Sequence, residues 1–536
     1  MTQRTSVQPT AARGVEGLDG SRTDVLIVGG GILGAGVAAE LSRRGHSCLL
    51  VEQVDFGHGT TARSTRLIHG GLRYLVMFDL GLVREGLRER SWQLREMPNL
   101  VRPLGLMLVH YDEPAWRRAR ARFGLSVYDL LSPSGSLPRH RHLSRTDALA
   151  MEPALRERGL QGAELFWDGQ VELPERLVIE VLRRASEAGA DVRNYVAAIG
   201  LRRRGGRARA VELLDLRTNQ HATVAVDAVI NASGPWADVT LRQLGIERAP
   251  LLRLSQGIHL VYPRLSEHAI AFEHPRDGRL CFAIPWQDAT MVGTTDTDVD
   301  GPPEAARIRP EDVSYLAQVV DRHFSRPVAP MWASVGVRSL ARDGEHGSLP
   351  QSVSRHHVLV DHAADGAQGL FTLAGGKLTA WRATGEFVAN RLEAGMPNAR
   401  RTVASSASPD RTPPRWDTEL PERLWRLYGV RAGELNRWIE ADPWWAEPVL
   451  PGGEALRAEV AHAFAQEWAV TLADVVLRRL ALGFGPDLGE RAASAMAAIC
   501  QARLGWSDDR VERELGEFRA QNLERRLPSD SQAAAA

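Results

Sequence analysis

A single lysine stands among the 66 basic residues of this 536-residue chain, and its neighbours favour anion binding. Lys377 follows Gly375 and Gly376 at the end of an apolar run. Lysine carries a compact ammonium that can approach an anion where the planar fork of arginine would clash. The two glycines would allow backbone N–H groups to turn toward the same anion. A lysine on a solvated face is the alternative, and the glycines alone do not decide between the two.

A glycine pattern near the start of the chain is typical of a dinucleotide site. Gly29, Gly31 and Gly34 follow an apolar run at residues 24–28 and precede a stretch with helical spacing. These glycines would permit a tight turn and let the backbone reach a pyrophosphate at the helix N-terminus. Glu52, at the end of the next apolar run, could accept hydrogen bonds from ribose hydroxyls and would repel a 2′-phosphate. The alternative, a glycine-rich turn without a ligand, is disfavoured by the complete strand–turn–helix–strand context.

FAD and NAD share this pattern, and the residues that follow Glu52 favour FAD. Residues 57–64 form a polar segment of small side chains directly after the second predicted strand, and they include Thr60, Thr61 and Ser64. A loop of this kind suits a cofactor that extends further into the protein. We therefore predict an FAD site.

The order of the predicted elements indicates a nucleotide-binding domain interrupted by insertions. Helical spacing at 35–44 and a strand at 47–52 complete a βαβ unit with the first strand. Strands predicted at 227–231 and 369–373 each run into a turn that contains glycine. Residues 250–300 carry aromatic and β-branched runs, which predict antiparallel sheet in a second domain.

The composition limits the functional class and the compartment. The length suits roughly three structural units. Acidic and basic residues balance at 66 each, so no overall charge attracts nucleic acid. The three cysteines lie far apart, which predicts neither a disulfide framework nor a metal site and fits a reducing, cytoplasmic location. No apolar window is long enough to cross a bilayer, so any membrane contact must be peripheral.

Several motifs together resemble those of the FAD-dependent glycerol-3-phosphate dehydrogenases, flavoenzymes that pass electrons to quinone. The most specific is the string Ile-His-Gly-Gly-Leu-Arg-Tyr-Leu at residues 68–75. The other motifs lie at residues 27–36, 231–236, 293–296, 336–338 and 375–379, and the resemblance runs from about residue 22 to about residue 525. With the order of elements, it predicts an α/β fold: a Rossmann-like FAD-binding domain with an inserted antiparallel-sheet substrate domain and a C-terminal helical domain.

The chain is accordingly expected to divide into four segments. These are a disordered tail at 1–22, an FAD-dependent oxidoreductase region at 23–400, a linker at 401–418 and a helical domain at 419–525. The linker is rich in Ser, Pro, Asp and Thr, whereas the last segment is rich in Ala, Leu, Arg and Glu with helical spacing. The predicted FAD-binding parts are about 23–80, 150–250 and 335–400, and the predicted substrate parts are about 81–149 and 251–334.

The resemblance implies oxidation of glycerol 3-phosphate to dihydroxyacetone phosphate, with hydride transfer to flavin N5. A buried phosphate is costly unless cations and donors pair with it. Matching family positions place the substrate beside Arg73, Tyr74, Arg338, Arg355, Lys377 and Thr379. With the glycines of the later motifs, the predicted cofactor contacts are Gly29, Gly31, Gly34, Glu52, Thr60, Thr61, Ser64, Gly234, Gly375 and Gly376.

Two histidines are candidates for the base that takes the hydroxyl proton. His259 ranks first because the family places this position near the substrate, and His69 is the alternative. The resemblance implies that Arg338 steadies the developing alkoxide. The alternative for both is the more common one, a structural histidine that makes its hydrogen bonds within a core strand.

Three positions depart from the family pattern. Trp381 replaces a tyrosine and is expected beside the site, while Gly385 replaces an alanine and Glu40 replaces an aspartate as a harmless surface change. Because of Trp381, a flavoenzyme of another small anion, such as an amino acid or a 2-hydroxy acid, stays open. A non-catalytic flavin-binding redox sensor is the remaining alternative, and it would not need the cations Arg73, Arg338 and Lys377.

Quinone is the electron acceptor that the resemblance implies, at the cytoplasmic face of a membrane, while direct reaction with oxygen stays open. Residues 116–122 are basic and amphipathic, so they could dock on lipid or form a solvated helix face. Oligomeric state is not readable from the sequence, and a homodimer stays open.

Overall fold

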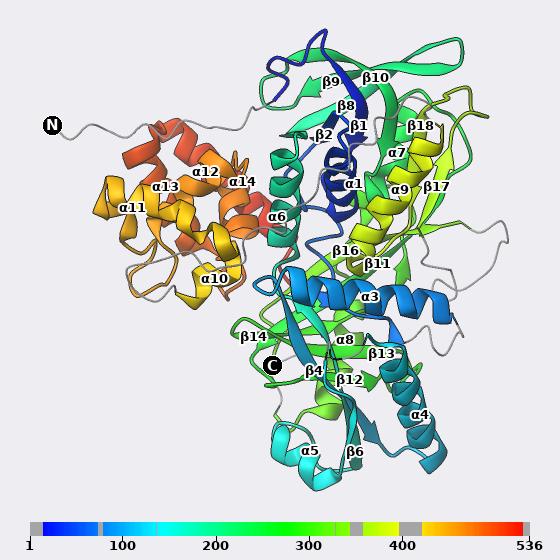
Figure 1. The fold of residues 1–536 in the computed structure, drawn as a ribbon. Helices are drawn as coiled ribbons and strands as arrows, with labels where there is room; N and C mark the ends of the chain where they lie inside the picture. The colour runs from blue at the N-terminus through cyan, green and yellow to red at the C-terminus, as the bar shows by residue number, and fades with distance from the viewer. Residues whose placement is uncertain are drawn as a thin grey trace.

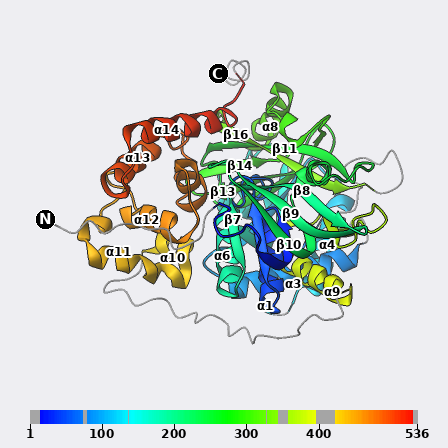
Figure 2. The ribbon, with the colours of Figure 1, turned by 90° about the horizontal axis from the view of Figure 1, so that it is seen from above.

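The computed structural model divides into two parts built on β-sheets and one helical part (Figure 1). The helical part, orange to red in both views, lies beside the sheet-containing parts (Figure 2). This architecture confirms the predicted α/β fold class with a C-terminal helical domain. The structure describes residues 14–72, 79–133, 135, 137–326, 328–342, 357–395 and 421–528.

The first sheet carries the glycine-rich turn. Its strands lie in the order β17–β18–β10–β1–β2–β7, and β9 pairs with β10 and β8. The strands are β1 (Arg22–Val28), β2 (Cys48–Glu52), β7 (Asp191–Asn194), β8 (Val196–Arg204), β9 (Arg207–Asp215), β10 (His221–Asn231), β17 (Val358–Asp361) and β18 (Leu370–Ala374). Pairing is parallel from β18 through β10, β1 and β2 to β7, so the carboxyl ends of these strands meet at one edge.

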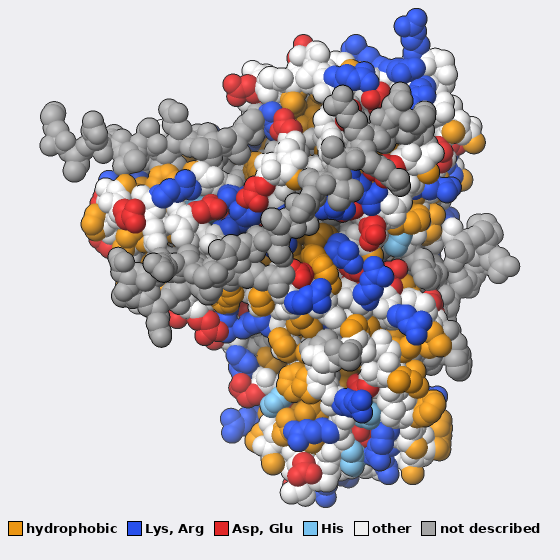
Figure 3. All heavy atoms as spheres, viewed as in Figure 1, with side chains coloured by type: hydrophobic (Ala, Val, Ile, Leu, Met, Phe, Trp, Pro, Cys, Tyr) orange, Lys and Arg blue, Asp and Glu red, His pale blue; other side chains and the backbone are white. Residues whose placement is uncertain are grey.

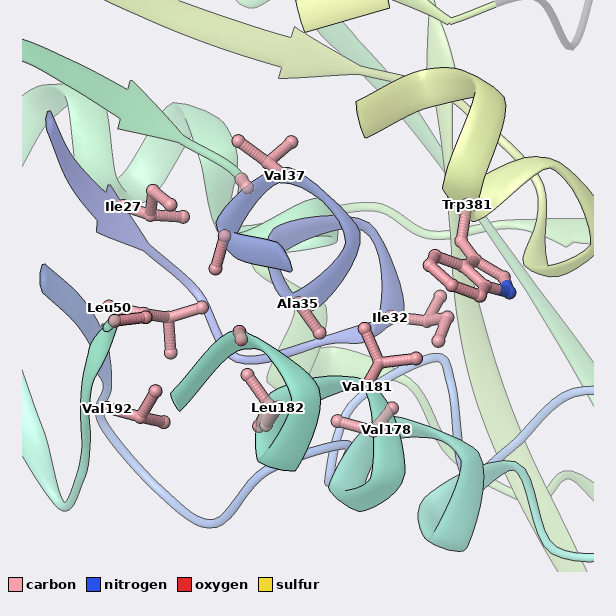
Figure 4. Packing of buried hydrophobic residues seen from close by; sticks show 14 of the residues in the cluster. Ile27, Ile32, Ala35, Val37, Leu50, Val178, Val181, Leu182, Val192 and Trp381 are labelled. Carbon is pink, nitrogen blue, oxygen red and sulfur yellow. The ribbon is translucent and has the colours of Figure 1, made fainter. Parts of the chain in front are cut away.

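One face of this sheet is covered by α1 (Ile32–Arg43), which packs between α6 (Pro174–Glu187) and α9 (Trp381–Gly395) (Figure 4). Two glycines bring α1 and α9 together, because a Cβ on Gly385 would lie 2.5 Å from the carbonyl oxygen of Gly36. The alanine that the family usually has at position 385 would therefore push the two helices apart.

Trp381 lies in the core and not beside the predicted site. Its side chain is 5% exposed and packs against α1 near Ile32 (Figure 4). The indole Nε1 donates to Gln93 Oε1 at 3.1 Å. The expectation that this tryptophan lies beside the site is wrong, because α9 begins at residue 381 and directs the ring into the contact with α1.

Glu40 is also more than a surface change. Its carboxylate lies 2.7 Å from both Arg43 and Arg44, and Arg44 lies 2.8 Å from Glu393 on α9. These partly buried ion pairs connect α1 with α9. The partner helix is remote in sequence, so helical spacing alone could not reveal it.

The second sheet is antiparallel except where β12 pairs with β4. Its order is β15–β11–β14–β13–β12–β4–β6–β3, with β16 beside β11 and β5 beside β6. The strands are β3 (Leu67–Ile68), β4 (Val101–Tyr111), β5 (Arg141–Leu143), β6 (Leu160–Val171), β11 (Leu252–Pro263), β12 (Ala269–Glu273), β13 (Leu280–Trp286), β14 (Ala289–Gly293), β15 (Thr297–Asp298) and β16 (Trp332–Ala341).

Three strands of this second sheet fall in segments that were predicted to bind FAD, and the first of them, β3, lies within 23–80. β6 lies within the predicted FAD-binding part 150–250, and most of β16 lies within 335–400. β6 pairs along β4, and β16 pairs along β11, so both belong to the second sheet. The predicted boundaries followed the order of the chain, whereas strand pairing joins segments that are far apart in it.

Further helices cover the two sheets. They are α3 (Leu80–Glu96), α4 (Ala115–Leu131), α5 (Arg145–Met151), α7 (Ala237–Gln243) and α8 (Pro310–His323). Of the helices that the structure describes, none combines the length and the apolar character needed to cross a bilayer.

The C-terminal domain has its own apolar core. Its α-helices are α10 (Glu422–Tyr428), α11 (Asn436–Ala441), α12 (Arg457–Gln466), α13 (Glu490–Leu504) and α14 (Asp508–Leu523). Buried ion pairs tie it to the first part, among them the pair of Arg176 on α6 with Glu467, whose Nη1 and Oε2 atoms lie 2.7 Å apart.

The predicted disordered tail at 1–22 is too long. Val15 and Leu18 are buried in the core beside the first sheet, and Arg193 Nη1 donates to the carbonyl oxygen of Gly14 at 3.1 Å. Buried apolar side chains and hydrogen bonds to the backbone therefore fix this segment together. Residues outside the description include 1–13, the predicted linker 401–418 and the end after 528.

Candidate active site

A cavity of about 500 Å³ lies at the carboxyl edge of the first sheet. Its walls come from the segments that follow β1, β2, β10 and β18, and from β11 and β16 of the second sheet. The predicted residues on these walls are Gly29, Gly31, Glu52, Thr60, Thr61, Ser64, His69, Gly234, His259, Arg338, Gly375, Gly376, Lys377 and Thr379. The predicted residues outside the described ranges are Arg73, Tyr74 and Arg355.

The glycines after β1 have different roles. Gly29 has a φ of 113°, and a Cβ there would lie 2.6 Å from the carbonyl oxygen of Ala232. Gly34 stands behind the turn, because its Cβ would lie 2.0 Å from the carbonyl oxygen of Gly29. Gly31 lines the cavity at the N-terminus of α1, where an anionic pyrophosphate would be favoured. Gly29 and Gly31 thus face the cavity, and Gly34 lets α1 start close to them.

Glu52 is held in one orientation by two backbone donors. The N–H of Gly30 donates to Oε2 at 2.7 Å, and the N–H of Val54 donates to Oε1 at 2.9 Å. Burial raises the pKa of Glu52, and these two N–H groups oppose the rise. The remaining lone pairs of the carboxylate could accept hydrogen bonds from ribose hydroxyls.

The loop after β2 connects the two sheets. Thr61 Oγ1 accepts a hydrogen bond from the N–H of Ile32 at 3.2 Å, which holds the loop against α1. Thr60 Oγ1 donates to the carbonyl oxygen of Val337 in β16 at 2.6 Å. Both hydroxyls are engaged within the protein, so the contact of these threonines with a cofactor stays a prediction.

His259 projects from β11 and is almost fully buried. Its Nε2 lies 3.0 Å from Thr65 Oγ1, while Nδ1 is buried and has no hydrogen-bond partner among the described residues. Burial, followed by the charges of Arg338 and Arg66, lowers the pKa of His259 to about 3. Gly293 in β14 makes room for the ring, since a Cβ there would lie 2.2 Å from Cδ2. The imidazole is therefore neutral, the form that can accept a proton.

Arg338 on β16 is held by a set of acceptors. Its Nη1 lies 3.1 Å from Asp296 Oδ1, and its Nη2 donates to Thr294 Oγ1 at 2.8 Å. The same Nη2 donates to the carbonyl oxygen of Thr295 at 3.0 Å. Gly257 on β11 leaves the space, because a Cβ there would lie 2.1 Å from Nη2. The guanidinium is thus fixed on the cavity wall.

The residues that support Arg338 were not predicted to be functional. Thr294 and Asp296 belong to the motif at 293–296, which contributed to the resemblance without an assigned role. Gly257 stands two residues before His259 in the chain. The sequence signals for these residues were a glycine and a Thr-Thr-Asp string close to predicted strands. That both contact Arg338 follows only from the pairing of β11 with β16.

Lys377 lines the same cavity, just before the short helix Leu378–Ala380. Thr379 is buried, and its Oγ1 accepts a hydrogen bond from the N–H of His69 at 3.1 Å. This threonine therefore positions the backbone of His69. Of the four predicted phosphate cations, the described structure brings Arg338 and Lys377 to one cavity.

Two family models match the chain. The FAD dependent oxidoreductase model matches residues 24–391, and the model of the C-terminal domain of alpha-glycerophosphate oxidase matches residues 371–511. The two matches overlap at residues 371–391, and the second covers α10 to α13 of the helical domain and the first residues of α14.

Individual relatives agree with these models. The chain is 33% identical over 533 residues to the glycerol-3-phosphate dehydrogenase of Synechocystis sp., covering 92% of this chain and 95% of that protein. It is 35% identical over 369 residues to the aerobic glycerol-3-phosphate dehydrogenase of Staphylococcus aureus, covering 67% of this chain and 65% of that protein. The fold matches the X-ray structure of the glycerol-3-phosphate dehydrogenase from Bacillus halodurans complexed with FAD, with a TM-score of 0.74 and 24% identity, over 96% of this chain and 97% of that chain. The resemblance seen in the motifs is confirmed: the chain belongs to the FAD-dependent oxidoreductases and, among them, to the glycerol-3-phosphate dehydrogenase family.

Proposed function

We propose that this protein oxidises the secondary alcohol of glycerol 3-phosphate to dihydroxyacetone phosphate, with FAD as its cofactor. The observation that carries the proposal is that Arg338 and Lys377 share one cavity wall with His259. A phosphate dianion withdrawn from water needs more than one cation to offset its lost hydration. A substrate carboxylate would need fewer.

The residues around the cavity suit FAD. The turn at Gly29 and Gly31 leaves space for a pyrophosphate, and Glu52 could accept hydrogen bonds from the ribose. Gly375 and Gly376 have φ values of 74° and 96°, which side chains rarely adopt, so the backbone can turn toward the cofactor there. FAD, when bound, supplies the hydride acceptor.

We propose His259 Nε2 as the atom that receives the hydroxyl proton. Nδ1 is buried and has no hydrogen-bond partner among the described residues, whereas Nε2 lies beside the hydroxyl of Thr65, another residue of the cavity wall. A dianionic substrate would add negative charge near Arg338 and raise the low pKa of the imidazole. The ring would then approach the range in which a general base is effective.

Anaerobic mixing of the purified protein with glycerol 3-phosphate tests the substrate and the cofactor together. The absorbance of oxidised flavin is expected to bleach promptly with glycerol 3-phosphate and to persist with glycerol, glycine or lactate. Faster bleaching by glycine or lactate would contradict the proposed substrate. A protein that purifies without flavin and takes up none from added FAD would contradict the cofactor.

We also propose a quinone acceptor reached at the cytoplasmic surface of a membrane, and an exposed apolar stripe on α4 supports this. Trp116, Phe123 and Leu130 are 59%, 71% and 83% exposed. Their spacing of seven residues places them on one face of the helix. Arg117 and Arg120 lie 5.6 and 5.4 Å from the ring of Trp116. Aromatic rings next to arginines suit the interface of an anionic bilayer, and Figure 3 shows apolar and basic side chains together over the lower end of the molecule, where Figure 1 places α4.

Removing two aromatic rings from this stripe should weaken membrane binding. Trp116→Ser combined with Phe123→Ser is expected to lower the affinity for phosphatidylserine-containing vesicles by about 100-fold or more, because each ring loses roughly 1.5–3 kcal/mol of burial in lipid. Co-sedimentation with the vesicles measures this affinity. Leu216→Ser is the matched control, because Leu216 is 49% exposed and lies just after β9. Equal binding by the double variant and the control would contradict the α4 surface.

A further inference from the structure

A second, smaller cavity adjoins the proposed active site. It has a volume of about 130 Å³, roughly a quarter of that of the first cavity, and lies where the second sheet meets the C-terminal domain. The two cavities share four wall residues, which are His58, Arg63, Ser64 and Arg66. Such a volume suits a ligand much smaller than FAD.

Positive charge exceeds negative charge around this second cavity. Arg66 is matched by Glu175, whose carboxylate accepts hydrogen bonds at 3.0 and 3.2 Å. Arg63 lies 3.7 Å from Glu524, but the side chain of Glu524 is 71% exposed and therefore neutralises it weakly. Arg525 donates from Nη1 to Asn522 Oδ1 at 3.2 Å, a neutral acceptor.

The other titratable groups on the wall do not offset this surplus. Arg478 forms ion pairs with Asp55 and Asp474 at the domain interface. Burial, followed by the neighbouring Arg63, lowers the pKa of His58 well below its usual value, so this ring is neutral. The wall thus has four guanidinium groups and the two carboxylates of Glu175 and Glu524. Since Arg478 pairs with aspartates outside the wall, one guanidinium, that of Arg525, is left without a carboxylate partner among the described residues.

Aromatic rings hold the guanidinium groups in place. Arg66 lies 4.2 Å from the ring centroid of Trp286, and Arg525 lies 4.2 Å from that of Trp332. Phe484 completes the stack at 5.4 Å from Arg66 and 5.3 Å from Arg525. Stacking occupies the faces of the guanidinium groups and leaves their N–H edges to donate hydrogen bonds.

One of these N–H edges has no acceptor. Arg525 Nη2 is buried and has no hydrogen-bond partner among the described residues. Burial, followed by the charges of Arg66 and Arg63, also lowers the pKa of Arg525 to about 9. A buried charged donor without an acceptor is destabilising, and a bound anion would relieve it.

We propose that this second cavity binds a small oxyanion, a carboxylate or a phosphate ester, with Arg525 Nη2 as its main donor and Arg63 and Arg66 as further positive charge. The apolar part of such a ligand would rest among the side chains of the wall that carry no charge, such as Met291 and Leu477. Arg525 lines this second cavity and not the one that holds His259 and Arg338, so binding here can be distinguished from binding of the proposed substrate.

Calorimetric titration of the flavin-bound protein with inorganic phosphate, and separately with benzoate, tests this site. Arg525→Met is expected to weaken the binding of at least one of these probes by about 30-fold or more, as for a buried charge pair that loses one partner. Binding of phosphate alone would assign the phosphate class, and binding of benzoate alone the carboxylate class. Arg503→Met is the matched control, because Arg503 also stacks on a ring, that of Trp444, at 4.4 Å.

Two results would overturn the proposal. The first is that Arg525→Met binds both probes with unchanged affinity. The second is that Arg338→Met abolishes all binding of both probes, which would place that binding in the first cavity. If Arg525→Met fails to fold, crystals of the parent soaked in selenate decide the matter. An anomalous peak within hydrogen-bond distance of Arg525 Nη2 supports the site, and a cavity that holds only water overturns it.

Discussion

Replacing Arg338 with methionine is expected to lower kcat/KM for glycerol 3-phosphate by about 30- to 5,000-fold, corresponding to roughly 2–5 kcal/mol. The guanidinium is fixed by Asp296 and Thr294 and lies on the wall of the proposed active site. Methionine keeps much of the volume of arginine but offers neither positive charge nor a donor. It also leaves the buried carboxylate of Asp296 with less compensation.

Steady-state kinetics with two further variants make this result specific. Arg279→Met is the control, because Arg279 also lies near Asp296, at 3.6 Å, but does not line the cavity. Its kcat/KM should stay within about threefold of the parent, since only a longer, weaker ion pair is lost. Arg338→Lys keeps the charge and loses the planar fork, so an intermediate value is expected. Equal losses in both methionine variants would show that the effect comes from Asp296 and not from contact with substrate.

The distribution of the loss between kcat and KM identifies the role of Arg338. A fall in kcat means that the guanidinium stabilises the alkoxide that develops as the proton leaves. A rise in KM alone means that it binds the phosphate equally well before and during the reaction. We expect the larger change in kcat, because Arg338 and His259 line the same cavity, so the guanidinium would lie near the oxygen that loses its proton to the imidazole.

The part of the cavity wall around the glycine-rich turn could be predicted because its sequence signals are local. The run before Gly29, the turn itself and Glu52 all lie within one βαβ unit, and the hydrophobic pattern of each piece is visible in a short window. Parallel strands then bring their carboxyl ends to one edge without any further information. The positions of Gly375 and Gly376 follow from the same rule, because they come directly after β18.

The other half of the site depends on contacts between remote segments. Arg338 meets its partners because β16 pairs with β11, and the periodicity within one strand does not say which remote strand it pairs with. The position of Trp381 was mispredicted for the same reason, since its hydrogen-bond partner Gln93 lies on a helix that is remote in the sequence. The resemblance placed Arg338 beside the substrate and Trp381 beside the site, but it gave no information on the packing that puts Trp381 in the core.

Replacing Asp55 with asparagine is expected to destabilise the junction between the first part and the C-terminal domain by about 3–5 kcal/mol. Asp55 is fully buried, and its carboxylate accepts hydrogen bonds from Arg479 Nη1 at 2.7 Å and Nη2 at 2.8 Å. It also accepts from Arg478 Nε. Asparagine keeps the shape but leaves the Arg479 guanidinium without its buried counter-charge.

The same junction should weaken in acid. Burial alone would raise the pKa values of Asp55 and Glu467, but Arg479 and Arg478 lower the first, and Arg176 lowers the second to about 2. Both folded-state pKa values thus lie below the unfolded ones. The stabilisation is therefore complete above about pH 5 and is lost as the pH falls through about 4 toward 2.

Urea unfolding of the C-terminal domain at pH 7 and at pH 4 measures both effects. The parent should lose stability between the two pH values, and Asp55→Asn should start lower and lose less, because one titrating carboxylate is gone. Glu490→Gln is the control for an exposed pair, since Glu490 lies 3.1 Å from Arg519 at the surface and should contribute less than about 1 kcal/mol. If Asp55→Asn unfolds at the same urea concentration as Glu490→Gln, the buried carboxylate does not hold the domains together, and the apolar contacts between them must carry the junction alone.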